Sequence, residues 1–212
     1  MSAPGWTRET ADAATRRGVA VKRWAAWTAA GAMLVAAWGV AAITPPDDAA
    51  SAPFPVAATL GSEATGRNMA LTVTNPRMSE GATGRSAAQS RALWSAEGTW
   101  LVVDLEARSL DSDTGVHLNL VDLVVGERTF SASDRPVSMR RIGLATGLDQ
   151  SGGLAYELPE DILDDAGAAT ARLRLGLSDD DRLDSVIELQ LDLTTLPHES
   201  DAEIAEPDWS RP

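Results

Sequence analysis

The chain of 212 residues contains no cysteine and only two histidines. Without cysteine it can form no disulfide framework, lipid-modified cysteine, thiolate zinc site or cysteine nucleophile. Basic side chains are also scarce, because 18 lysines and arginines face 31 acidic residues and the formal net charge is −13. Nucleic-acid binding depends on a basic face that neutralises phosphates, so this balance argues against nucleic acid as a partner.

Charged side chains are absent from one run of the chain, residues 24–43, in which Thr28 is the only polar residue. A helix needs about 20 apolar residues to cross the core of a bilayer, and this run is long enough. Trp24, Trp27 and Trp38 lie toward its ends, where indole rings favour the membrane interface. We therefore predict a transmembrane helix over residues 24–43, with the lipid bilayer as its partner.

The charges that flank this run predict its orientation. Residues 1–23 carry five basic groups against two acidic ones, whereas a Pro-Pro-Asp-Asp sequence follows at 45–48. Excess lysine and arginine stay on the cytoplasmic side of a membrane. We expect residues 1–23 to form a cytoplasmic basic segment and everything after Thr44 to lie outside the cell, which makes the chain a single-pass protein of the cell membrane.

The apolar run is longer than a signal-peptide core and lies far from the first residue, which favours an uncleaved anchor. The alternative is cleavage after the small-residue sequence Ala-Ser-Ala at 50–52, which would release a secreted domain. Prolines at positions 45, 46, 53 and 55 predict a Pro/Ala-rich linker over residues 44–66. Residues 197–212 hold five acidic groups against Arg211, and they predict an acidic disordered tail.

Between linker and tail, residues 67–196 are expected to form the folded extracellular module. Apolar residues recur there at every second position, the period of a half-buried strand. The clearest strand is 101–108, where Leu101, Val103, Leu105 and Ala107 alternate with Val102, Asp104, Glu106 and Arg108. Similar stripes occur at 71–74, 116–125, 154–158, 173–177 and 187–193.

Turn residues separate these stripes. Asn75-Pro76 ends the first one, Gly126-Glu127 predicts a hairpin turn, and residues 160–169 are the only short helical stretch. Seven or eight strands with one apolar face each predict an all-β fold, an antiparallel β-sandwich of immunoglobulin type. Packing alone must hold such a sandwich together, because a cysteine pair is absent.

The order of the motifs is recognisable, although each motif is mainly structural. A Gly-Thr-Trp-Leu-Val-Val-Asp-Leu-Glu-Ala strand at 98–107 precedes a hairpin that ends near Phe130, and Ser-Gly-Gly-Leu-Ala-Tyr-Glu-Leu-Pro follows at 151–159. Over roughly residues 68–193 the chain resembles a family of extracellular immunoglobulin-like domains of unknown function, similar to secreted mycobacterial immunoprotective antigens. Two departures are Arg108-Ser109, where that family often has Asn, and the missing lipid-anchoring cysteine.

The resemblance implies an extracellular binding domain and supplies no catalytic residues. Arginine outnumbers lysine seventeen to one, a bias of high-GC genomes that, together with the resemblance, indicates an actinobacterial cell envelope. A hydrolase needs a nucleophile, a base and a group that orients the base. His117 alternates outward between Val116 and Leu118, which favours an exposed strand histidine over a catalytic base. The acidic run at 179–184 departs from a calcium loop because Leu183 occupies the fifth position. We expect no enzyme activity, cofactor or metal.

The connection at 79–98 is unusually long and is therefore predicted as a contact loop. It contains Trp94 beside Arg91 and Leu93, a combination typical of a binding anchor with charged surroundings. Trp100 is instead expected to cap the core. The sequence thus favours a non-catalytic module that binds an unknown envelope protein or wall component. The alternatives are a secreted antigen-like sandwich and an envelope enzyme.

Overall fold

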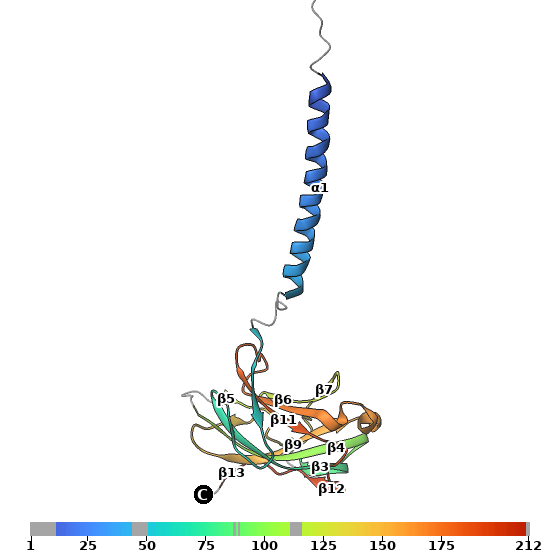
Figure 1. Cartoon of the computed structure of the whole chain (residues 1–212). Coiled ribbons are helices and arrows are strands. Elements are labelled where there is room, and N and C mark those ends of the chain that lie inside the picture. The colour runs from blue at the N-terminus through green and yellow to red at the C-terminus, as the bar shows by residue number, and fades with distance from the viewer. Residues whose placement is uncertain (1–11, 44–50, 87, 89, 111–115, 211–212) are drawn as a thin grey trace, which may run out of the picture. The chain divides into compact units, whose positions relative to one another are not determined.

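A computed structural model describes residues 12–43, 51–86, 88, 90–110 and 116–210 of the chain. It divides into two compact units, Met1–Ala50 and Ser51–Pro212, which we describe separately (Figure 1). Parts of three predicted segments lie outside the described residues. These are 1–11 of the basic segment, 44–50 of the linker and 211–212 of the tail.

The N-terminal unit contains one helix, α1 (Asp12–Ile43). Its stretch Trp24–Ala42 is long and apolar enough to cross a bilayer, and Trp24, Trp27 and Trp38 are all exposed to solvent. By length and composition, this helix is suited to be a membrane anchor or a signal sequence. The helix begins earlier than the predicted span because the preceding residues include alanines and arginines, which are good helix formers.

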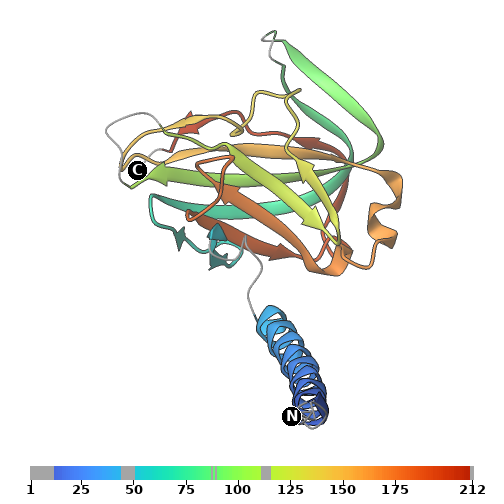
Figure 2. The same cartoon turned by 90° about the horizontal axis from the view of Figure 1, so that it is seen from above.

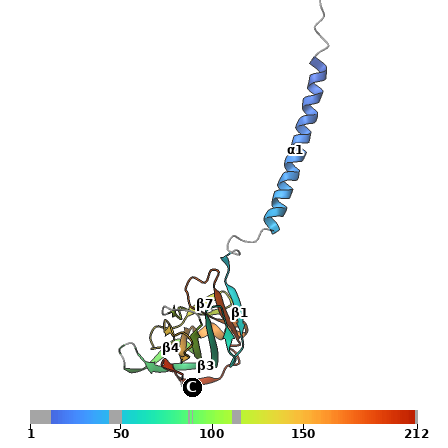
Figure 3. The ribbon, with the colours of Figure 1, turned by 90° about the vertical axis from the view of Figure 1, so that its left-hand side faces the viewer.

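The C-terminal unit is a β-sandwich whose two main sheets face each other (Figures 1 and 3). The five-stranded sheet has the order β1-β11-β10-β6-β7, and the six-stranded sheet has the order β12-β3-β4-β9-β13 with β2 beside β3. A separate two-stranded sheet joins β5 and β8. The strands are β1 (Phe54–Ala58), β2 (Ala64–Thr65), β3 (Met69–Arg85), β4 (Arg91–Ser109), β5 (Val116–His117), β6 (Leu120–Val125), β7 (Arg128–Ser131), β8 (Gly143–Leu144), β9 (Gln150–Leu158), β10 (Ala171–Gly176), β11 (Ser185–Leu191), β12 (His198–Glu203) and β13 (Asp208–Trp209).

The main core lies between the two sheets and is formed by the predicted apolar stripes. Leu101, Val103 and Leu105 of β4 are buried there against Leu173 and Ile187 of the opposite sheet. Removing large aliphatic side chains from water contributes roughly 1.5–3 kcal/mol each to the free energy of folding. The prediction of a β-sandwich is therefore confirmed.

The immunoglobulin type is not shown, and the sheets are not purely antiparallel. β1 runs parallel to β11, and β12 runs parallel to β3. Both parallel strands lie at sheet edges. β1 comes from the start of the C-terminal unit and β12 comes from near its end. The alternation of apolar residues did not predict either segment as a strand.

Both predicted module boundaries are wrong, because the linker and the tail each contribute strands. Residues Phe54–Ala58 of the predicted linker form β1, where Pro55 is tolerated because an edge strand needs fewer backbone donors. Residues His198–Glu203 of the predicted disordered tail form β12. The composition of the tail is polar overall, but backbone pairing with β3 and burial of Ala202 and Ile204 are enough to order it.

Residues 79–98 do not form the predicted long loop. β3 and β4 continue into this region as a hairpin that extends beyond the two sheets (Figure 2). The predicted break at Asn75-Pro76 is a bulge within β3, where Asn75 adopts a φ of 49°. The turn at Gly126 joins β6 to β7 as predicted, with a φ of 59°. The expected helix at 160–169 consists of two short 3-10 turns, Glu160–Asp164 and Ala168–Thr170.

Changing Val103 to Asp should destabilise the C-terminal unit by about 4 kcal/mol or more, because an unpaired carboxylate would enter the main core. Val103 is fully buried, whereas Glu106 on the same strand faces the other side and is partly exposed. The matched control Glu106→Gln should leave the midpoint of urea unfolding nearly unchanged. Equal losses of stability in the two variants would show that the faces of β4 are assigned incorrectly.

Candidate functional site

The C-terminal residues cross the outer face of the six-stranded sheet. We call residues 198–210 the C-terminal strap. The strap begins as β12 beside β3, its Ala205 carbonyl accepts a 2.8 Å hydrogen bond from the Gly153 amide of β9, and it ends as β13 beside β9. It therefore joins the two edges of the β3-β4-β9 layer and covers the face between them.

A second apolar cluster lies beneath the strap. Trp100 and Val102 of β4 and Ala155 of β9 are buried there against Ala202 and Ile204 of the strap. A Cβ atom at Gly153 would lie 3.0 Å from the Ile204 Cγ2 atom, so glycine lets the strap approach the sheet closely. The alternation placed Val102 on the face of β4 opposite to the main core, and the strap buries that side chain as well. Trp100 is buried as expected, but in this outer cluster.

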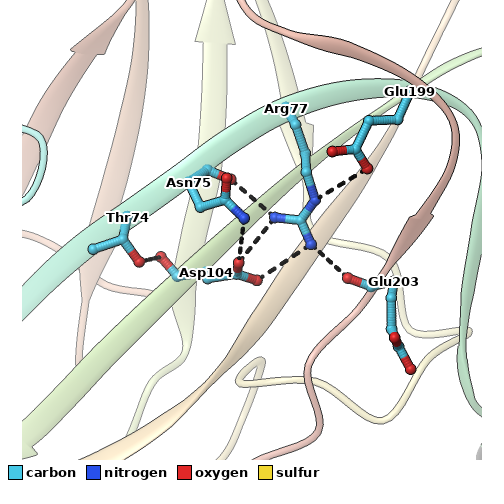
Figure 4. Close-up of polar contacts among 6 residues, drawn as sticks. All are labelled: Thr74, Asn75, Arg77, Asp104, Glu199 and Glu203. Carbon is cyan, nitrogen blue, oxygen red and sulfur yellow. Dashed lines mark hydrogen bonds and ion pairs between the residues drawn. The ribbon is translucent and has the colours of Figure 1, made fainter.

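Arg77 fastens the strap to the sheet (Figure 4). Its guanidinium donates 2.9 Å hydrogen bonds to Asp104 Oδ2 and to the Asn75 carbonyl, and it also donates to the Glu203 carbonyl of the strap. The Nε atom lies 3.7 Å from the Glu199 carboxylate. Arg77 is only 6% exposed, so one buried cation holds two carboxylates and two carbonyls in place.

Sequence reasoning assigned no role to Arg77. The signal available was an arginine two residues after a strand break, on a chain whose acidic residues outnumber its basic ones. That signal is too common to single out a buried ion pair. The contacts of Arg77 come from three separate parts of the chain, β3, β4 and the strap.

The hairpin of β3 and β4 places the three predicted contact residues on two different faces. Arg91 and Leu93 alternate with Trp94, so they share a face that Trp94 does not. Leu93 is 65% exposed. Trp94 packs against the second cluster, and a Cβ atom at Gly84 would lie 3.5 Å from its ring and 3.4 Å from Ile204 Cβ. Of the three residues predicted as contacts, Arg91 and Leu93 are therefore accessible, and Trp94 packs beside the strap.

A surface hollow of about 530 Å³ opens between the hairpin and the strap. Its lining residues are Gly84, Arg85, Arg91, Glu203, Ile204, Ala205 and Glu206. Two 3.0 Å ion pairs cross it, Arg85–Glu206 and Arg91–Glu203. All four charged side chains are well exposed, so each exposed pair contributes no more than about 1 kcal/mol to stability, and its members can exchange their partners for those of a bound molecule.

The residues weighed for chemistry lie elsewhere in the module. His117 is exposed on β5, in the small β5–β8 sheet. In the acidic turn at 179–184, Arg182 pairs with Asp180 at 2.6 Å and lowers the pKa of that carboxyl to about 2, and Arg174 pairs with Asp181 at 2.8 Å. No group of three His, Cys, Asp or Glu side chains suited to a metal ion occurs among the described residues.

Comparisons with known proteins assign the chain to no family. No family model matches the chain, and no curated protein matches it. Among solved structures, an uncharacterized β-sandwich protein from Clostridium difficile 630 superposes with a TM-score of 0.44 and 8% sequence identity, over 70% of this chain and 99% of the other. The comparisons do not support the predicted resemblance to immunoglobulin-like mycobacterial antigens.

Changing Arg77 to Ala should lower the free energy of unfolding by about 2–4 kcal/mol, because Asp104 and the Glu203 carbonyl would lose their buried partner. The control Arg182→Ala removes an exposed pair and should leave stability nearly unchanged. Urea unfolding followed by circular dichroism measures both changes. An Arg77→Ala protein as stable as the control would show that the strap does not depend on Arg77.

Changing Trp94 to Ala should cost about 2 kcal/mol of stability, because the ring is half-buried against Ile204. Leu93→Ala removes an exposed side chain one position away and should change the thermal midpoint by no more than a degree or so. Differential scanning calorimetry distinguishes the two variants. If Leu93→Ala were the more damaging change, the faces of the hairpin would have to be exchanged.

Proposed function

We propose that the chain is a single-pass membrane protein of the cell envelope whose outward β-sandwich binds another protein or a wall component without catalysing a reaction. The apolar stretch Trp24–Ala42 of α1 supports the anchor. Five basic residues precede this stretch and two aspartates follow closely after it, which supports an N-terminus inside the cell. The actinobacterial origin of the chain is part of the same proposal and rests on its arginine bias.

The observation that carries the binding role is the exposed Leu93 on the projecting hairpin (Figure 2). Leu93 is the most exposed large apolar side chain among the described residues of the C-terminal unit, so its surface is available for contact with a partner. Arg91 lies on the same face, two residues away, and arginine is enriched among residues that dominate binding energy. The hollow beside the hairpin provides exposed charges of both signs around this anchor.

Protease added to wall-less host cells should remove the C-terminal unit and leave an N-terminal fragment that contains α1. This follows from the positive charges before the apolar stretch. Immunoblotting with a tag at each end reads out the two fragments. Protection of the C-terminal tag from the protease would show that the C-terminal unit lies inside the cell and that the proposed orientation is wrong. A mature chain that begins near Pro53, found by mass spectrometry, would replace the anchored form by the secreted one.

Leu93→Asp should weaken recovery of envelope partners by the tagged full chain roughly tenfold, as expected when a hot-spot side chain is lost. Leu148 is similarly exposed, at 58%, and lies between β8 and β9, so Leu148→Asp is the matched control. Quantitative mass spectrometry after cross-linking in cells compares the two. Partners lost equally from both variants, or from neither, would place the binding surface away from the hairpin.

A further inference from the structure

The strand β12 (His198–Glu203) forms an open edge of the six-stranded sheet. It pairs with β3 on one side and with no other strand among the described residues. Every residue of β12 except Ala202 is exposed. Backbone amides and carbonyls on such an edge are a ready template for another extended chain. The strand contains no proline or lysine, and its formally charged side chains are all carboxylates.

The side chains of β12 determine which chain the edge accepts. Glu199, Asp201 and Glu203 give the strand three carboxylates. If two copies of β12 paired with each other, these like charges would lie side by side and destabilise the pair. Arg77 and Arg91 approach Glu199 and Glu203, whereas Asp201 forms no ion pair with any described residue. The edge therefore disfavours a second copy of itself and retains negative charge for a basic chain.

The apolar side chain of Leu93 lies beside this edge. Gly81 of β3 is opposite Asp201, and the carboxylate of Asp201 and the Cδ1 atom of Leu93 both approach the position where a Gly81 side chain would begin. Since glycine has no side chain there, Leu93 and Asp201 lie close together on the same face of the sheet. A strand added next to β12 would extend this face, with its own side chains next to Asp201.

We propose that the β12 edge binds an extended peptide segment of a partner protein in which Arg or Lys alternates with apolar residues. The peptide adds as a further strand beside β12. Its backbone pairs with the amides and carbonyls of β12 that face away from β3, apart from the Glu203 carbonyl, which accepts a hydrogen bond from Arg77. Its basic side chains meet Asp201 and the neighbouring carboxylates. This inference rests on the proposed function, because it names the kind of partner that the module with its Leu93 anchor receives.

The test uses the full chain in phosphatidylcholine nanodiscs and fluorescent hexapeptides whose binding is measured by anisotropy. The probe is Arg-Val-Arg-Val-Arg-Val. A Glu-Val peptide of the same length tests charge, and the Arg-Val peptide with alternate backbone nitrogens methylated keeps the charge but cannot pair as a strand. Asp201→Asn should weaken binding of the Arg-Val probe about 2–5-fold, the effect of one exposed charge pair. Asp179→Asn, an exposed change in the acidic turn at 179–184, should leave binding unchanged.

The inference is supported if the Arg-Val peptide binds, if the methylated and Glu-Val peptides do not, and if Asp201→Asn weakens binding of the Arg-Val peptide. Equal binding of the methylated and unmethylated peptides overturns it, since attraction between charges alone would then explain the result. No binding of the Arg-Val probe also overturns it, although Leu93-dependent recovery of partners would leave the proposed function standing. Analytical ultracentrifugation tests self-association of the chain. A dimer that becomes more stable in Asp201→Asn would assign the β12 edge to a second copy of the chain and would overturn the proposal of a basic peptide partner.

Discussion

The buried guanidinium of Arg77 is the interaction on which the outer half of the module depends. It is a cation on a sheet face, and burying it is favourable only because Asp104 and the carbonyls of Asn75 and Glu203 satisfy its donors. The same contacts hold the C-terminal strap against the sheet. Once the strap is in place, Trp100 and Val102 leave water, and a strand with one predicted apolar face becomes buried on both.

This arrangement explains how a module without disulfides covers both sides of its central strand. The main core fills the space between the two sheets, and the second cluster fills the space between the sheet and the strap. The C-terminal unit uses its last residues to cover the six-stranded sheet and residues near its start, Phe54–Ala58, as the edge strand β1 beside β11. Both ends of the module are therefore part of the fold, and the surfaces that we propose for partners are the projecting hairpin and the β12 edge.

The strand stripes could be predicted from the sequence because alternation is a local property. Leu101, Val103 and Leu105 were assigned to the core from their spacing, and they are buried. The hairpin turn at Gly126 could also be predicted from the sequence, since its positive φ favours glycine. The alternation did not predict the burial of Val102, because that burial depends on a segment about a hundred residues later in the chain. Of the predicted contacts, the pattern named Arg91, Leu93 and Trp94 but could not say which of them the strap would cover.

The sequence by itself determined the apolar helix, the β-sandwich class and the acidic character of the module, because length, period and charge are properties of short stretches. The tertiary structure decided the strap, the Arg77 network and the separation of Leu93 from Trp94. Each of these joins residues that are distant along the chain, such as Arg77 and Glu199. Their meeting depends on strand order and register, which arise from the packing of the whole module rather than from any single segment.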